Sequence, residues 1–192
     1  MSKIPVKIVE LTSPSGKNAI DVMIDFYDYN EIDNVQEKIK KFKMKYFDII
    51  KKAEKLFYGK GDEKKKYQYL PSSIYWELGI LLEKFNNEIK NEFEITNYTE
   101  AISRDFDLSK DYIYDILTIV KVFKKNQILD SVKFSYYRAL KRKRNELSKL
   151  NLFQNEIKRL NKMGTDNKLP GREKYKLELI EIIKNAKSQE DN

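Results

Sequence analysis

Residues 102–117 read ISRDFDLSKDYIYDIL and decide the fold. Ile102 and Phe106 are four residues apart, so they share one face of a first helix. Ser103 is small and lies where a second helix would cross the first. Asp107 lies at the turn, because aspartate tolerates a left-handed backbone better than most residues. This pattern predicts that a first short helix ends near Phe106.

A second helix follows directly, over about residues 110–124. Ser109 precedes it and is a good N-cap residue. Leu108 is expected to fill the space beneath the turn. The buried face of the second helix is predicted from its apolar spacing and comprises Ile113, Ile116, Leu117 and Val120. The stretch therefore predicts two short helices joined by a tight turn.

The spacing from Ile102 to Ile116 resembles the helix-turn-helix of many bacterial and archaeal DNA-binding proteins. Ser103 stands where that family usually has alanine, and Asp107 stands where it usually has glycine. The resemblance implies that the second helix enters the major groove of duplex DNA.

The resemblance continues downstream. A second likeness is to the central domain of ParB-type partition proteins, which is similar over residues 117–123, 128–129 and 132–140. A third is to a Trp-containing helix of some nuclease-associated proteins, which residues 75–79, YWELG, resemble. Together these likenesses cover about residues 72–145. The arginine-rich nucleotide-binding box of ParB proteins is missing upstream, so we predict no CTP binding.

The outward positions of the second helix would meet the DNA. They are Ser109, Lys110, Asp111, Tyr114, Asp115 and Thr118. Lys110 is able to reach a guanine edge or a phosphate, and Tyr114 a phosphate or a thymine methyl group. The carboxylates of Asp111 and Asp115 are repelled by phosphates unless they accept from cytosine N4 or are neutralised by a neighbouring base.

A basic segment follows the two helices. Five of its seven residues are cationic, namely Arg138, Lys141, Arg142, Lys143 and Arg144. Such a run is often only a solvated helix face. Beside a helix-turn-helix, phosphate binding is the better interpretation, and Lys121, Lys124 and Lys125 would extend the same surface. The run Lys64-Lys65-Lys66 is better explained as a solvated loop.

The rest of the chain is predicted to be mainly α-helical, with a small N-terminal β-ribbon. Residues 6–11 and 20–29 have the alternation of two strands, and residues 31–57 have the apolar spacing of a long helix. Another helix begins near Pro71. Three parts are therefore expected: a ribbon and long helix at 1–57, a helical domain with its basic extension at 70–163, and a C-terminal helix at 172–187.

Residues 136–162 form a basic segment that carries a helical stripe. The stripe consists of Leu147, Leu150, Phe153, Ile157 and Leu160. It suits either a seam for pairing two copies or the core of a single chain, and its short length favours the core. Residues 164–171 contain Gly164, Pro170 and Gly171 and read as a linker.

Composition excludes several functions. The chain has 192 residues, no cysteine and no histidine, so it lacks thiolate and imidazole metal ligands and histidine general bases. Glu10, Asp21 and Asp25 do not have the spacing of a two-metal nuclease site. No glycine-rich phosphate loop is present. We therefore predict a protein that is not an enzyme, with no cofactor, no metal and no small-molecule substrate.

The charge points to a polyanionic partner. The net charge is +8, and because residues 1–35 carry −3, the remainder carries +11. Apolar runs long enough to span a membrane are absent, so a cytoplasmic protein without a membrane partner is expected. The sequence predicts a protein that binds double-stranded DNA and has a regulatory, partition or architectural role. A homodimer would suit this function. The alternative is a helical adaptor whose basic face binds RNA or an acidic protein.

Overall fold

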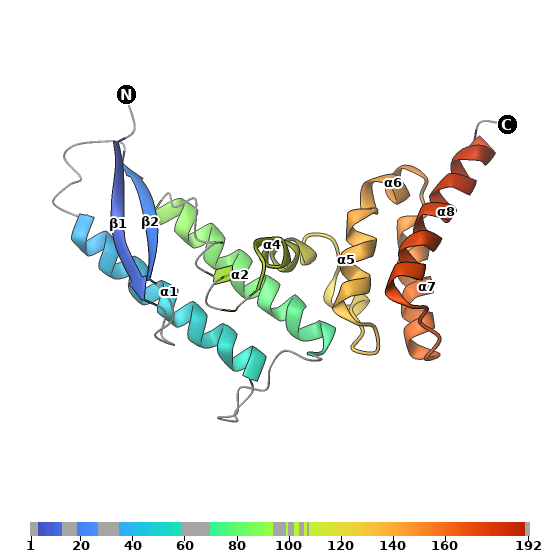
Figure 1. Cartoon of the computed structure of the whole chain (residues 1–192), viewed down its shortest axis with the longest axis horizontal. Helices are drawn as coiled ribbons and strands as arrows, with labels where there is room; N and C mark the ends of the chain where they lie inside the picture. Colours follow the sequence, from blue (N-terminus) through green and yellow to red (C-terminus); the bar gives the residue numbers. More distant parts are fainter. Residues whose placement is uncertain are drawn as a thin grey trace. The chain divides into compact units, whose positions relative to one another are not determined.

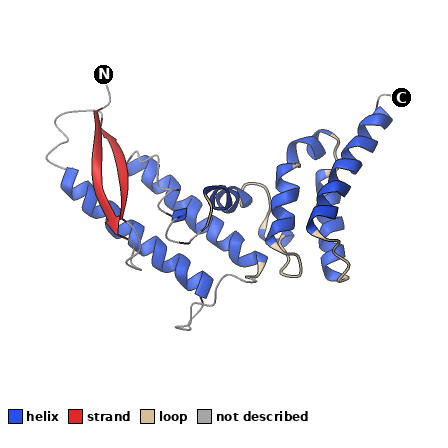
Figure 2. Cartoon of the chain, in the orientation of Figure 1, coloured by secondary structure: helices blue, strands red, loops and turns tan. Residues whose placement is uncertain are grey.

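The computed structural model describes residues 4–12, 19–26, 35–58, 70–93, 99, 102–103, 106 and 108–190. The chain forms two compact units, the first from Met1–Lys66 and Leu78–Leu117, the second from Tyr67–Glu77 and Thr118–Asn192. Helices α2 (Ser72–Phe93) and α4 (Lys110–Ile119) contribute residues to both units. The described part is mainly helical, as the sequence predicts (Figure 1, Figure 2).

Two strands, β1 (Ile4–Thr12) and β2 (Ala19–Phe26), pair antiparallel near the N-terminus and are red in Figure 2. The pairing places Ile4 opposite Phe26. The side chains of both strands lie outside the described residues, and so do residues 27–29, where the second strand was expected to end. The apolar face expected on the second strand therefore stays a prediction.

The first unit is held together by aromatic packing between α1 (Val35–Tyr58) and α2. The ring of Phe85 on α2 lies 6.3 Å from the ring of Phe42 and 6.3 Å from that of Tyr46, both on α1. The buried residues follow the predicted stripes and include Phe42, Tyr46, Ile49 and Ala53 on α1 and Leu78, Leu82 and Phe85 on α2. Helical spacing in the sequence thus identifies this core.

The second unit is built from α5 (Phe134–Arg142), α6 (Arg144–Lys149), α7 (Phe153–Thr165) and α8 (Arg172–Glu190). The basic segment over residues 136–162, predicted from its helical stripe, is divided among α5, α6 and α7. The interruption at Asn151 has a clear cause, because this residue has a φ of 55° and the Leu152 N–H donates to the Leu147 carbonyl at 2.8 Å. Asparagine adopts this left-handed backbone readily after the last turn of a helix.

This turn also divides the apolar stripe between two helices. Leu147 lies on α6, whereas Phe153, Ile157 and Leu160 lie on α7, and all four are buried within the chain. The core interpretation is thus confirmed for these four residues, whereas Leu150 is half-buried.

Gly164 belongs to α7 and is buried, so the linker predicted from residue 164 is wrong at its start. A Cβ atom at this position would lie 2.3 Å from Val132 Cγ2. Real Cβ atoms do not approach other atoms so closely, so glycine allows α7 to pack directly on the segment that contains Val132. The helix ends beyond Thr165, where Asn167 has a φ of 54° and Lys168 N donates to Met163 O.

The first turns of α2 belong to the second unit and are hydrogen-bonded to other residues of that unit. The backbone N–H and the hydroxyl of Ser73 donate to the two carboxylate oxygens of Asp130, at 2.9 and 3.1 Å. The indole N–H of Trp76 donates to the carbonyl of Phe123 at 3.0 Å. The Ser73 N–H lies in the first turn of α2, where N–H groups have no partner within the helix, so the Asp130 carboxylate caps this helix.

A buried ionic cluster joins α7 to α8. The Arg159 guanidinium donates to both carboxylate oxygens of Glu156 and, at 3.1 Å, to Glu178. Glu156 is 4% exposed and also accepts from the hydroxyl of Tyr175 at 3.1 Å. Hydrogen bonding to Glu156 raises the pKa of Arg159, and burial raises the pKa of the Tyr175 hydroxyl. Each charge in the cluster has a partner, as a buried ion pair requires.

Candidate nucleic-acid interface

The helix that contains Ile102 and Ser103 is interrupted before α4. The Phe106 N–H donates to the Ile102 carbonyl at 3.0 Å, and the Leu108 N–H donates to the Ser103 carbonyl at 3.0 Å. A bond that spans five residues is typical of a helix C-terminus. Leu108 and Ser109 are not helical, so the chain does not continue as one helix into α4. Asp107 lies outside the described residues, and its left-handed backbone stays a prediction.

Ser103 is buried, as the crossing of two helices would require. Its hydroxyl donates to the carbonyl of Leu108. This bond gives the hydroxyl a partner within the turn, which the sequence did not reveal. The serine therefore satisfies a carbonyl that alanine, the usual residue of the resembled family at this position, would leave without this donor.

Ser109 caps α4 as predicted, because the Tyr112 N–H donates to its hydroxyl oxygen at 3.2 Å. The α4 helix ends at Ile119, earlier than the predicted residue 124, and residues 120–122 form turns. Ile113 and Ile116 are fully buried and Leu117 is 8% exposed, which confirms the predicted inner face for these three residues. Val120 is only half-buried.

Four of the six residues predicted to face outward are exposed. Ser109, Lys110 and Asp111 are exposed, and the Tyr114 side chain is 63% exposed. Asp115 is only 4% exposed, so its predicted outward position is wrong. One of the two carboxylates that opposed DNA binding is therefore absent from the outer face.

Thr118 belongs to the second unit and is half-buried. Its hydroxyl accepts a hydrogen bond from the ammonium group of Lys141. Thr118 and Lys141 therefore bind each other, and neither is placed as an independent DNA contact. Lys121 follows α4 and is exposed.

The basic segment is divided by its own helical geometry. Arg138, Arg142 and Lys143 line a groove of about 240 Å³ between α5 and α8, whereas Lys141 points to Thr118. Arg144 is exposed at the start of α6. The structure thus places only three of the five predicted cations around one concave surface.

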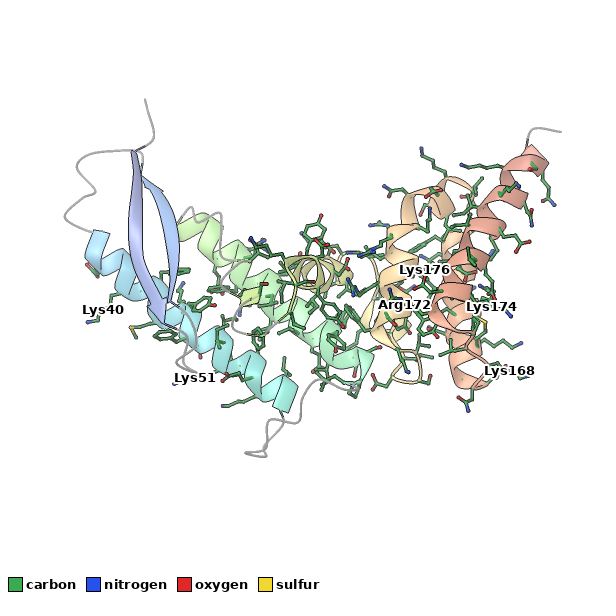
Figure 3. The ribbon with its side chains drawn as sticks, in the orientation of Figure 1. Lys40, Lys51, Lys168, Arg172, Lys174 and Lys176 are labelled. Atoms are coloured by element: carbon green, nitrogen blue, oxygen red, sulfur yellow. The ribbon has the colours of Figure 1, made fainter. Side chains whose placement is uncertain are left out.

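The other wall of this groove was missed by sequence reasoning. Arg172 and Lys176 on α8 line it together with Leu179 and Ile180. In Figure 3, Arg172 and Lys176 lie on the side of α8 that faces α5, and Lys174 lies on the other side. The spacing of four residues between Arg172 and Lys176 does predict a shared face, but nothing in the sequence shows that this face meets α5.

Two carboxylates form ion pairs with cations of the groove and partly neutralise its positive charge. Lys143 donates to Glu146 at 2.8 Å, and Lys176 and Arg172 lie 2.8 and 3.4 Å from Glu173. Hydrogen bonding to these lysines lowers the pKa of Glu146 and of Glu173, so both stay ionised at neutral pH. Five cationic side chains line the groove, so positive charge remains in excess.

Among the described residues, no cluster of three or more acidic side chains is arranged to hold a metal ion. The side chains of Glu10, Asp21 and Asp25 lie outside that part of the chain. No helix within it is long and apolar enough to cross a bilayer. The chain matches no family model, no curated protein and no solved structure. The resemblance to helix-turn-helix proteins therefore rests on the residues quoted above.

Proposed function

We propose that this chain binds duplex DNA through a helix-turn-helix, with α4 as the recognition helix, and that it catalyses no reaction on the DNA. The observation that carries the proposal is the geometry of residues 102–117. A helix end closed by the bond from Leu108 to Ser103 is followed by a helix capped by Ser109, with Ile113 buried beneath. A recognition helix needs this arrangement to present its first turns to the major groove.

The exposed chemistry of α4 suits a role in reading bases. Lys110 is a donor for guanine O6 and N7, and Asp111 is an acceptor for cytosine N4. Tyr114 offers a large exposed ring and a hydroxyl beside them. A surface with both donors and acceptors is able to distinguish base pairs, whereas a purely cationic surface binds every sequence alike.

The second unit supplies the charge that such binding needs. Arg138, Arg142, Lys143 and the exposed Lys121 and Arg144 would neutralise backbone phosphates and release counterions. These contacts would hold DNA without sequence preference, while α4 would provide the preference. The biological role would be that of a regulator, a partition protein or an architectural protein.

Selection of bound sequences from a pool of random duplexes tests the proposal. We expect enrichment of a short consensus with the wild-type chain and loss of that consensus with the variant Lys110→Ala/Tyr114→Ala. A palindromic consensus would further support a homodimer that reads two half-sites. A pool from which no duplex is retained at low salt would contradict the proposal.

An adaptor function is the second candidate, favoured by the exposed apolar residues of α8. The side chains of Leu177 and Ile180 are 66% and 50% exposed, close to the cations of the groove. Large exposed apolar side chains near charge are a feature of protein-binding surfaces. Retention of an acidic protein domain by the wild-type chain, lost in Leu177→Ser/Ile180→Ser and combined with no DNA binding, would favour this function instead.

A further inference from the structure

We infer that the groove between α5 and α8 binds the sugar–phosphate backbone of one strand of the duplex, an inference that rests on the proposed DNA-binding function. It assigns Arg172 and Lys176 as phosphate contacts. Both belong to a helix that the sequence marks only as a separate C-terminal segment. The groove thus becomes a clamp for the backbone, distinct from the base-reading face of α4.

The spacing of the cations matches a backbone. Arg138 and Arg142 are four residues apart on α5, and Arg172 and Lys176 are four residues apart on α8. Four residues of helix rise about 6 Å. This is close to the separation of successive phosphates along a strand, so each wall offers one cation to each of two neighbouring phosphates. Arginine adds a planar fork that binds phosphate oxygens in pairs.

The floor of the groove is apolar and suits the sugars that lie between phosphates. Ala139 and Leu179 are 7% and 1% exposed, and Ile180 stands half-exposed beside them. The hydroxyl of Ser135 at the rim adds a neutral donor for a phosphate oxygen. All nine lining residues are described and none is aromatic, so the groove lacks the rings on which unpaired bases stack. A backbone whose bases remain paired fits this lining better than a single strand.

The existing ion pairs do not close the groove to phosphate. Glu173, which pairs with Arg172 and Lys176, and Glu146, which pairs with Lys143, have side chains that are 75% and 42% exposed. Exposed pairs of this kind contribute little stability. A phosphate that binds one cation from each wall is therefore able to replace them.

An acidic protein segment is the rival occupant. It would bring carboxylates at variable spacing and would need an apolar anchor for the floor. Leu179 and Ala139 are almost completely buried, so the floor offers Ile180 alone as a substantial apolar contact. The regular four-residue spacing of cations along each wall favours a polymer with evenly spaced charges, which is the nucleic-acid backbone.

The test compares two charge-matched double variants of the full chain. Arg172→Gln/Lys176→Gln removes two groove cations, and Lys168→Gln/Lys174→Gln removes two exposed cations that do not line the groove (Figure 3). Binding to one random-sequence duplex is measured over a range of salt concentrations. Each lost phosphate contact reduces the log–log salt slope by about 0.9, so the groove variant should lose about 1.8 and the control should keep the wild-type slope.

The outcomes are distinct. Equal slopes for the two variants would overturn the groove inference while leaving DNA binding intact. Loss of binding to poly-glutamate in the groove variant, with its DNA slope unchanged, would assign the groove to an acidic protein. If the wild-type chain binds no duplex, the proposed function itself fails and the inference with it. Should the groove variant not fold by circular dichroism, Arg142→Gln on the opposite wall is expected to reduce the slope by about 0.9.

Discussion

The outer face of α4 and the groove between α5 and α8 are two surfaces of different chemistry. The α4 face carries a lysine, an aspartate, a serine and a tyrosine within six residues, whereas the groove is lined by five cations over an apolar floor. Mixed donors and acceptors are suited to distinguishing base pairs, and concentrated positive charge to holding a polyanion of any sequence. Under the proposed function, recognition of bases would therefore belong to the first unit and affinity for the backbone to the second.

The two surfaces also differ in how they are supported. The α4 face depends on local bonds between residues close in sequence, such as the cap from Ser109 to Tyr112. The groove depends on residues more than thirty positions apart, brought together by packing such as the ring contact of Tyr136 with Tyr175 at 5.4 Å. Substitutions in the core should therefore disturb one surface without the other.

The largest expected effect is on stability, from the core of the first surface. Ile113→Ala should lower the free energy of unfolding by about 2–5 kcal/mol, because Ile113 is fully buried and its truncation leaves a cavity. Tyr114→Ala is the matched control, since the next residue along the helix is 63% exposed and should change stability by less than about 0.5 kcal/mol. Urea denaturation measures both. Similar losses from the two variants would mean that α4 is not packed as described.

A glycine pair sharpens the comparison for the second surface. Gly164→Ala should destabilise the chain by about 1–3 kcal/mol, because the new Cβ atom would meet Val132 Cγ2 at 2.3 Å. Gly171→Ala meets nothing within 4 Å and should be neutral or slightly stabilising. Thermal unfolding of both variants checks this. A neutral Gly164→Ala would show that α7 does not pack on the Val132 segment as closely as described.

Sequence discrimination should depend on α4 alone. Lys110→Ala and Tyr114→Ala should each reduce the preference for the selected site over random duplex by about 1–3 kcal/mol. Arg142→Ala should weaken binding to both duplexes by the same factor, because a phosphate contact carries no sequence information. Dissociation constants for the two duplexes at one salt concentration give the answer. Equal changes from all three variants would assign no recognition to α4.

The smallest expected effect is a pH dependence in the core of the second unit. Burial raises the pKa of Tyr137 from 10.0 to about 12, and its hydroxyl donates to Asn161 and accepts from the Leu129 N–H. Because the folded pKa is the higher one, its stabilising effect is complete below pH 10 and is lost as the pH rises toward 12. Between pH 9 and 11.5, the free energy of unfolding of Tyr137→Phe should therefore fall less than that of the wild-type chain. Equal losses in both proteins would leave Tyr137 without a role in that dependence.

The local features of the first surface were predictable from sequence. Ser109 caps α4 and Ile113 and Ile116 are buried, because caps and helical spacing act over a few residues. Asp115 was misplaced, since spacing alone does not tell which flank of a helix is covered by the rest of the fold. The hydroxyl of Ser103 donates to the carbonyl of Leu108, and residue spacing in the sequence does not predict this bond.

The second surface was predictable only in part. The cations of α5 were identified, but their division between the groove and Thr118 was not, because helix packing determines it. The turn at Asn151 was hidden by an apolar stripe that continues in register across it. Arg172 was missed because the segment before it was interpreted as a linker, although Gly164 is a packing residue. The ionic cluster of Glu156 and Arg159 likewise depends on contacts between separate helices.

The salt dependence of duplex binding by the wild-type chain tests the central claim most directly. If about five phosphates are neutralised, the logarithm of the association constant should fall against the logarithm of salt concentration with a slope of about −4 to −5. The measurement requires one labelled duplex and a titration at several salt concentrations. A slope in that range is the result the account predicts. No detectable binding to duplex DNA at low salt, or binding that does not change with salt, would contradict it.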